Sequence, residues 1–165
     1  MKQLKARTIL AALLLLIWFL LTYPFDVQEL IVGGSVIIIV LVLPMPGIDV
    51  LGDLRWTPKA AVFGLAYVAY FFWQLLRANL DVAFRVLHPK LPIEPGIVRV
   101  RTKIRTRLGR LLLANSITLT PGTITVDARD EDFYVHWIKV EGGRDKERTE
   151  KIVAGFERFL EVMCG

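Results

Sequence analysis

The sequence predicts a helical membrane anchor joined to a small α+β domain on the cytoplasmic side. The chain has 165 residues, of which 54% are hydrophobic, and its mean hydropathy is +0.48. This is too apolar for an ordinary soluble domain, and the excess lies between Thr8 and Leu76. Residues 97–165 instead show short strand and helix patterns, and a domain of that size is near the lower limit for folding alone. We therefore expect an anchor, one small domain and support from partners.

The first apolar run covers about residues 8–23 and follows the basic side chains of Lys2, Lys5 and Arg7. A signal peptide has the same charged start and apolar run, but small residues should then mark its cleavage site. This run ends instead in aromatic residues such as Tyr23, which are typical of the interface between membrane and water. We predict an uncleaved transmembrane helix.

A second apolar run at about 27–43 is just long enough to cross the hydrocarbon layer. It is rich in β-branched residues, but its position beside another apolar run favours a second membrane helix, and thus a helical hairpin. Pro44 and Pro46 end it. Gly33 and Gly34 either permit close packing of the two helices or give the second helix a flexible start.

A third helix is predicted over residues 58–88. It follows residues 1–57, which hold the two-helix anchor and a loop, and it precedes the domain of residues 97–165. The positive-inside rule places the N-terminus in the cytoplasm, so two spans return Arg55 and Lys59 to that side. A third span would carry the basic C-terminal part outside. We therefore favour a helix on the inner membrane surface, with a third membrane span as the alternative.

Charged residues recur every four positions in the second half of this helix, at Arg77, Asp81 and Arg85. Such spacing is typical of a ladder of ion pairs on a helix surface. A proton path shared with a partner is the less favoured interpretation. Pro89 ends the helix and opens a proline-rich connector.

Apolar and polar residues alternate from Ile97 to Arg105, which predicts a strand with one buried and one basic face. The basic group, continued into the next segment, consists of Arg99, Arg101, Lys103, Arg105, Arg107 and Arg110. We expect this face to contact anionic lipid headgroups or an acidic patch on a neighbouring subunit, or else to be solvated. No aromatic residues interleave with the cations and no nucleic-acid motif is present, so nucleic acid is not an expected partner.

The remaining segments predict helix, strand, strand and helix, which gives the order β-α-β-β-α for the domain. Helical spacing over 108–119 puts several leucines on one apolar face, the strands cover about 123–128 and 132–140, and a last helix follows Gly143. We expect a split β-α-β unit with helices on one face, as in half of a ferredoxin-like fold. The apolar face expected in the first helix holds Leu108, Leu111, Leu112, Asn115 and Leu119, and that of the last helix Ile152, Val153, Phe156, Phe159, Leu160 and Met163, with Glu147 and Lys151 paired across one turn.

No arrangement of side chains in the sequence points to catalysis, a metal or another cofactor. Cys164 is the only cysteine, which excludes an intrachain disulfide and a cysteine-rich metal site. His88 and His136 are the only histidines, and neither has acidic residues at ligand spacing. The sequence therefore predicts a chain that is not an enzyme.

Two segments resemble the E subunit of Mrp-type multisubunit cation/proton antiporters. They are "NLDVAFRVLHPKLPIEPGIV" before the domain and "ANSITLTPGTITVD" within it, and the likeness extends over nearly the whole chain. The resemblance implies an accessory subunit of a plasma-membrane complex, with monovalent cation (Na+)/proton exchange carried by larger membrane subunits. Related modules belong to membrane-bound hydrogenases and their sulfur-reducing relatives. The only residues transferred from the resemblance are those of the turn: Leu119, Thr120, Pro121, Gly122 and Thr123.

Two functional hypotheses follow. The first is a non-catalytic, assembly-stabilising subunit of an antiporter module, partnered by other membrane subunits. The alternative is a membrane-tethered binding module whose α+β domain recruits a cytoplasmic partner. The aromatic character of residues 60–76 favours the first, because such a surface suits contact with membrane helices.

Overall fold

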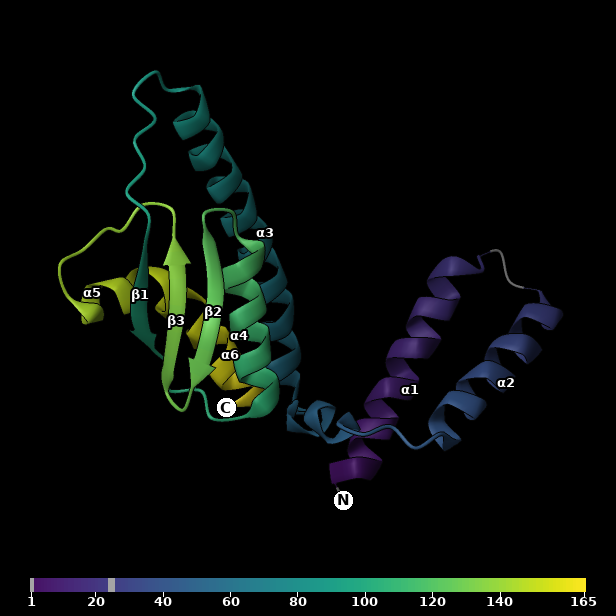
Figure 1. Cartoon of the computed structure of the whole chain (residues 1–165). Coiled ribbons are helices and arrows are strands. Elements are labelled where there is room, and N and C mark those ends of the chain that lie inside the picture. Colours follow the sequence, from purple (N-terminus) through teal and green to yellow (C-terminus); the bar gives the residue numbers. More distant parts are fainter. Residues whose placement is uncertain (1, 24–25) are drawn as a thin grey trace. The chain divides into compact units, whose positions relative to one another are not determined.

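The computed structural model describes residues 2–23 and 26–165, and it divides into two units (Figure 1). The first unit ends at Leu54, and the second runs from Arg55 to Gly165. Within these described residues, two helices are long and apolar enough to cross a membrane, namely Lys2–Leu21 in the first unit and Pro58–Leu87 in the second. The expected combination of apolar helices and a small α+β domain is therefore confirmed.

The first unit contains α1 (Lys2–Leu21), α2 (Val27–Val42) and a short 3-10 helix, η1 (Ile48–Asp53). Trp18 joins the two long helices, because its indole Nε1 donates to the carbonyl of Glu29 at 3.0 Å. Its ring also lies against Gly33, where a side chain would overlap it. Close packing is thus the correct interpretation of Gly33, whereas a Cβ on Gly34 would meet nothing within 4 Å.

Helix α1 begins six residues before the predicted start at Thr8. The reason is that the basic residues of its first turns contact the loop that follows α2. Lys2 Nζ lies 3.1 Å from a carboxylate oxygen of Asp53, and Lys5 Nζ donates to the carbonyl of Gly52 at 2.9 Å. The charged N-terminal segment is therefore part of the helix rather than a flank to it.

Helix α3 (Pro58–Leu87) starts at a well-defined cap, since the Thr57 hydroxyl accepts a hydrogen bond from the Ala60 amide at 3.1 Å. Pro58 occupies the first helical position, where its missing N–H costs nothing. The helix ends just before His88 and the proline-rich connector. The predicted range of 58–88 agrees with these bounds to within one residue.

Three strands form one antiparallel sheet in the order β1-β3-β2: β1 is Gly96–Arg101, β2 is Thr123–Arg129 and β3 is Asp132–Trp137. Residue Val98 pairs with Val135 across β1 and β3, and Thr125 pairs with the same residue from β2. Helix α4 (Arg107–Leu119) connects the two outer strands and, with α6 (Gly155–Cys164), covers one face of the sheet (Figure 1). The expected α+β layer is confirmed, while its kinship with half of a ferredoxin-like fold stays a prediction.

Strand β1 is shorter than the sequence predicted, because it ends at Arg101 rather than at Arg105. A carboxylate from the last helix takes over the pairing: Glu157 Oε1 accepts from the Thr102 hydroxyl at 2.7 Å and from the Lys103 amide at 2.6 Å. The alternation of side chains nevertheless continues, and Thr102 and Ile104 are buried as predicted.

The predicted apolar face of α4 is largely wrong. Leu111 and Leu119 were expected to be buried, but they are 52% and 60% exposed. Leu113 and Ile117 are buried instead, at 0% and 1% exposure. Only Leu108 of the predicted face is buried, since the helix is rotated so that its core side follows Leu113.

The last helix is interrupted by a π-helical turn, η2 (Glu150–Ala154), between α5 (Asp145–Thr149) and α6 (Gly155–Cys164). Its predicted apolar face is confirmed, and Val153 and Leu160 are fully buried. The expected Glu147–Lys151 pair is wrong, because the wider turn displaces Lys151 and its Nζ contacts Glu141 at 2.9 Å. The Glu147 carboxylate accepts from the Gly143 amide instead.

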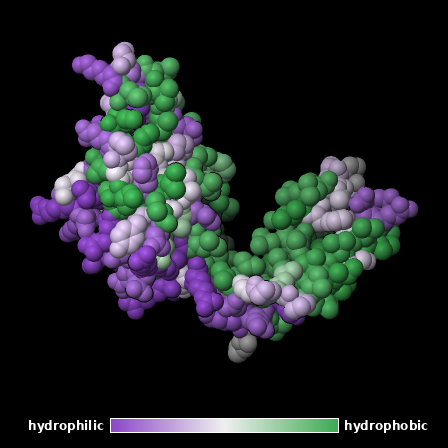
Figure 2. Space-filling model, in the orientation of Figure 1, coloured by the Kyte–Doolittle hydropathy of each residue, from purple (hydrophilic) through white to green (hydrophobic). Residues whose placement is uncertain are grey.

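Hydrophobic residues are unevenly distributed over the surface (Figure 2). They cover α1, α2 and part of α3, whereas the surface of the α+β domain beside the sheet is largely hydrophilic. The domain has its own core, in which Val100, Phe133 and Val135 are completely buried. The described residues of the first unit form no comparable core.

Candidate functional site

The predicted turn, Leu119–Thr123, joins α4 to β2 through threonine hydroxyls. Thr120 Oγ1 lies 2.9 Å from the carbonyl of Ile117, and Thr123 Oγ1 donates to the same carbonyl at 2.6 Å. These contacts satisfy backbone groups that the end of α4 leaves unpaired. The two threonines therefore hold the helix end against the start of the strand.

The glycine of this turn has a conformation and an environment that a larger residue does not fit. Gly122 has φ of 92°, and a Cβ there would lie 3.0 Å from Ile138 and 3.7 Å from Val82 of α3. Its carbonyl accepts from the Ile138 amide at 2.8 Å. The turn thus touches both the sheet and α3, while Leu119 at its start stays exposed.

The predicted basic face is present, but acids of the same domain neutralise much of it. Arg99 Nη2 contacts Asp145 at 2.9 Å, and Arg101 Nε contacts Asp132 at 3.0 Å. The hydrogen bond from Arg99 to Asp145 raises the pKa of Arg99 above its usual value, with a further contribution from the charge of Asp132.

The other predicted cations are distributed in the same way. Arg105 lies 3.4 Å from Glu131, and the Arg110 guanidinium donates to the Asp130 carbonyl and stacks on a buried aromatic ring. Arg107 also has an interaction partner, so Lys103 alone of the six has none for its side chain among the residues that the structure describes. Contact of this face with lipid or with a neighbouring subunit stays a prediction, now with less free charge to support it.

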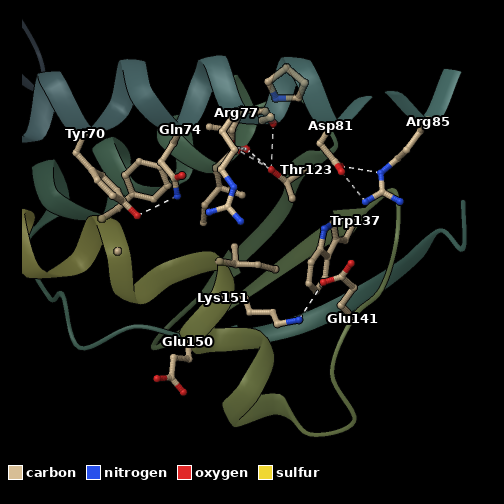
Figure 3. A pocket seen from close by; sticks show the side chains of 17 residues that line it. Tyr70, Gln74, Arg77, Asp81, Arg85, Thr123, Trp137, Glu141, Glu150 and Lys151 are labelled. Carbon is tan, nitrogen blue, oxygen red and sulfur yellow. Dashed lines mark hydrogen bonds and ion pairs between the residues drawn. The ribbon is translucent and has the colours of Figure 1, made fainter. Parts of the chain in front are cut away.

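A pocket of about 550 Å³ lies between α3, the turn and the last helical segment (Figure 3). Its α3 wall includes the predicted charge ladder of Arg77, Asp81 and Arg85. Two hydrogen bonds of 2.7 and 2.9 Å join Arg85 to Asp81, so this part of the ladder is confirmed. The apolar and turn residues of the wall include Ile117, Thr120, Pro121, Thr123, Ile152 and Phe156.

A second ion pair crosses the opposite side of the pocket. Lys151 Nζ lies 2.9 Å from Glu141, and this hydrogen bond lowers the pKa of Glu141 below its usual value, helped by the charges of Lys139 and Arg85. Sequence reasoning missed the pocket, because its walls come from four separate segments. The only signals that the sequence offered were the ladder and the turn, which showed no relation to each other.

Aromatic residues hold α3 against α6 beside the pocket. The Tyr70 ring lies 5.3 Å from the rings of both Phe156 and Phe159, measured between centroids. Its hydroxyl accepts from Gln74 at 2.9 Å and lies against Gly155. Among the described residues, no group of three or more histidine, cysteine or acidic side chains is placed to hold a metal.

Known proteins similar to this chain are antiporter subunits and one chain of a respiratory complex. The model of the Na+/H+ ion antiporter subunit family matches residues 11–162. The E1 subunit of a Na+/H+ antiporter from Staphylococcus haemolyticus is 32% identical over 93% of this chain and 94% of its own length. The E subunit of a Na+/H+ antiporter from Alkalihalophilus pseudofirmus is 41% identical over 58% of this chain, and the match spans 61% of that protein.

A solved structure agrees with these sequence matches. One chain of the membrane-bound sulfane sulfur reductase, an archaeal respiratory membrane complex, is 41% identical and has a TM-score of 0.82. The similarity covers 96% of this chain and 98% of that one. The resemblance found in the sequence is confirmed, and the chain belongs to the Na+/H+ ion antiporter subunit family, among the relatives of the E subunit.

Proposed function

We propose that this chain is a non-catalytic, assembly-stabilising subunit of an Mrp-type monovalent cation (Na+)/proton antiporter module. The module acts either as a stand-alone antiporter or as the ion-translocating part of a membrane-bound respiratory complex. Both settings occur among the relatives described above, which are antiporter subunits and a chain of a sulfane sulfur reductase complex.

The observation that carries this proposal is the large apolar surface that the chain leaves uncovered. Leu65, Phe72 and Leu80 are each more than 60% exposed along one side of α3, and Leu20 and Ile38 are similarly exposed on α1 and α2. Exposed apolar surface of this extent marks contact with lipid or with other subunits. A subunit that stabilises an assembly through membrane helices has this surface.

The distribution of charge in the apolar segments supports a structural role over direct ion transport. Residues 8–23, 30–43 and 60–76 contain no Asp, Glu, Lys, Arg or His. Such residues are costly within a membrane and are retained where ions or protons pass. We therefore place ion translocation in the larger subunits and support of their assembly in this chain.

We further propose that α3 lies along the inner membrane surface and that the α+β domain is cytoplasmic. Phe63 of α3 contacts Phe159 of α6, and Val82 lies beside the Gly122 turn, so the domain flanks α3 over 19 residues. At about 1.5 Å per residue this is about 28 Å, which is close to the thickness of the hydrocarbon layer, about 30 Å. A spanning α3 would pull the charged domain into hydrocarbon, whereas a surface helix leaves it in water.

Cysteine labelling in intact cells tests this topology. A Gly143→Cys variant places a thiol on an exposed loop of the domain, while the native Cys164 is only 1% exposed. We expect a membrane-impermeant maleimide to label the new thiol only after the cells are opened. Labelling in intact cells would contradict a cytoplasmic domain and favour a third span.

The exposed face of the sheet favours the alternative function, a membrane-tethered binding module. Ile97, Ile124 and Val126 are all more than half exposed on this face, and His136 lies between the first two in the strand register. Such a face also suits contact with a subunit of the same complex. The identity of the co-purifying proteins therefore decides between the two functions.

The deciding experiment is purification of the tagged chain in a mild detergent, with co-purifying proteins identified by mass spectrometry. We expect large antiporter-like membrane subunits, and redox subunits among them would identify a respiratory complex. A chain that purifies alone or with soluble proteins only would refute the assembly role.

Variants of the turn connect this role to the structure. Gly122→Ala strains a residue with positive φ and crowds Ile138, so we expect less assembled complex. Gly143→Ala is the control, because a Cβ there meets nothing within 4 Å and the residue lies outside the apolar helices. Ion selectivity of the complex that still assembles should be unchanged, and altered selectivity with normal assembly would contradict the proposal.

A further inference from the structure

The pocket beside α3 contains one cation that the fold does not neutralise. Arg85 is paired with Asp81, and Lys151 is paired with Glu141. Arg77 has neither an ion pair nor a hydrogen bond with any residue that the structure describes. The two pairs cancel within the pocket, which leaves the Arg77 guanidinium as its uncompensated charge.

The only other acid of the lining, Glu150, does not compensate Arg77. It lies on the far rim, and Figure 3 shows its carboxylate pointing away from the other labelled groups. In the same view Arg77 extends from α3 and Trp137 from β3 toward a shared space. The guanidinium is therefore directed at the pocket rather than at an acid of the chain.

A second hydrogen-bond donor in this pocket also lacks an acceptor. The indole N–H of Trp137 makes no hydrogen bond with the described residues, although the ring is partly buried in the pocket wall. The nearby hydroxyls of Thr120 and Thr123 are already used by carbonyls of α4. Apart from the Glu150 carboxylate on the far rim and the Gln74 amide oxygen, the free polar groups here are donors, and a ligand that matches them is an anionic acceptor such as a phosphate.

The size and walls of the pocket indicate a ligand larger than free phosphate. A volume of about 550 Å³ is within the range of sites for small organic molecules. Tyr70, Ile117 and Phe156 give the pocket an aromatic and aliphatic wall beside the cation. An anionic group attached to an apolar body fits both features.

The place of Arg77 on α3 identifies the source of such a ligand. The exposed apolar stripe of α3 contains Leu65, Phe72 and Leu80. Arg77 follows the exposed Trp73 by four residues and precedes Leu80 by three, so it lies at the edge of this stripe. If that stripe rests on the membrane, Arg77 is at the level of the headgroups. This step depends on the orientation of α3 given under the proposed function.

We propose that this pocket binds the phosphate of an anionic phospholipid, with Arg77 as the main cation and the Trp137 indole as a second donor. The apolar wall then contacts the glycerol and the start of an acyl chain. The lipid fills the space between α3 and the domain, and it fixes both at the membrane surface.

Native mass spectrometry of the full chain in a non-ionic detergent tests this proposal with phosphatidylglycerol as the probe. Arg77→Gln should lower the affinity for the first bound lipid about tenfold, since it removes a charge-assisted hydrogen bond. Lys146→Gln is the control, because it removes an exposed charge that lies outside both the pocket and the basic face. Equal losses in the two variants would overturn the proposal and indicate nonspecific surface attraction.

Trp137→Phe provides a second variant that keeps the ring and removes only the N–H. We expect it to weaken lipid binding about two- to fivefold, as for one neutral hydrogen bond. An unchanged affinity in both pocket variants overturns the proposal. Thermal unfolding of each variant is measured alongside, and a folded Trp137→Phe protein keeps the test decisive if Arg77→Gln is unstable.

Two further arms identify the occupant. Phosphatidylcholine should bind more weakly than phosphatidylglycerol, and inorganic phosphate at the same concentration should displace neither. Displacement by inorganic phosphate would overturn the lipid assignment, and so would an Arg77→Gln chain that keeps its lipid but loses a protein partner. The lipid-binding assay uses the isolated chain, so it does not depend on assembly. If the wild-type chain co-purifies with antiporter subunits but Arg77→Gln binds lipid as tightly as the wild type, this inference is refuted and the proposed function stays intact.

Discussion

Helix α3 has two apolar sides that the structure treats differently. On one side, Tyr67 and Tyr70 pack against α6 and each makes a specific hydrogen bond. On the other, Leu65, Phe72 and Leu80 contact little of the chain and are 62–76% exposed. Hydropathy alone does not separate these sides, because both are rich in large apolar residues. What separates them is packing, because the chain itself covers one side and leaves the other exposed.

Truncation of one aromatic residue on each side gives the largest expected difference. Tyr70→Ala removes two ring contacts at 5.3 Å and the hydrogen bond with Gln74, so we expect a loss of about 2–4 kcal/mol in the free energy of unfolding. Phe72→Ala, at a residue 62% exposed, should cost below about 1 kcal/mol.

Urea-dependent alkylation of the buried thiol of Cys164 measures both variants in detergent without an added label. Equal costs for the two variants would mean that the sides of α3 are energetically alike. The side of α3 that packs against α6 is its docked side. A larger cost for Phe72→Ala than for Tyr70→Ala would mean that the docked side has been assigned to the wrong face of the helix.

A smaller change tests how closely the docked side fits. The Tyr70 hydroxyl lies against Gly155, where a Cβ would overlap it, and overpacking typically costs about 1–3 kcal/mol. Gly155→Ala also gains about 1 kcal/mol in helix propensity, which opposes this cost. We expect net destabilisation of about 1 kcal/mol, measured by the same alkylation assay.

Gly143→Ala is the control for this substitution, because nothing lies within 4 Å of a Cβ at that position. Its free energy of unfolding should change by less than about 0.5 kcal/mol. A Gly155→Ala protein that is more stable than the wild type would show that Tyr70 moves aside freely.

The sequence predicted the elements of this fold better than their rotations. Periodicity located α3, the three strands and the buried face of the last helix, because these patterns are long or strictly alternating. It misassigned α4, where leucines at both Leu111 and Leu113 satisfy helical spacing and only packing selects one. It also missed the π-helical turn that moves Lys151 from Glu147 to Glu141, since no local pattern marks such a turn.

The difference between local patterns and distant contacts also explains which parts of the site were foreseen. The turn around Gly122 was recognised from the resemblance of its segment to the antiporter E subunit, and its contacts are local because neighbouring threonines bind the end of α4. The basic strand was recognised as well, but its neutralisation by Asp132 and Asp145 depends on contacts between distant segments. The pocket at Arg77 needs four segments at once, so only the three-dimensional structure reveals it.

A single hydroxyl on the docked side gives the next smaller effect. Ser116 Oγ donates to the Leu112 carbonyl at 2.6 Å, so the 2.5 Å contact with Tyr67 places the donor on the tyrosine. Tyr67→Phe should therefore cost about 1 kcal/mol, the usual net value of one hydrogen bond.

A double-mutant cycle with Ser116→Ala isolates this contact from other effects of each substitution. Tyr134→Phe is the control, because its hydroxyl makes no hydrogen bond with the described residues. A coupling energy near zero between Tyr67 and Ser116 would mean that this contact does not help to hold α3 in place.

The smallest effect concerns the charges at the rim of the docked side and depends on pH. Lys151 lowers the pKa of Glu141, and the charge of Arg85 on α3 contributes to the same shift. A carboxylate with a lowered pKa in the folded state stabilises the fold above its ordinary pKa of 4.5, and this contribution is lost as the pH falls through the folded value. At about pH 7 the wild type should therefore have a larger free energy of unfolding than Glu141→Gln. This difference should disappear at a pH below the folded pKa of Glu141, which itself lies below 4.5.

The difference should be at most about 1 kcal/mol, because both side chains of the pair are partly exposed and solvent screens them. Urea midpoints of the wild type and Glu141→Gln at the two pH values measure it. Glu150→Gln is the matched control on the neighbouring helical turn, and it should follow the wild type at both values. If Glu141→Gln also follows the wild type, the rim charges contribute nothing, and the docking of α3 rests on its aromatic contacts alone.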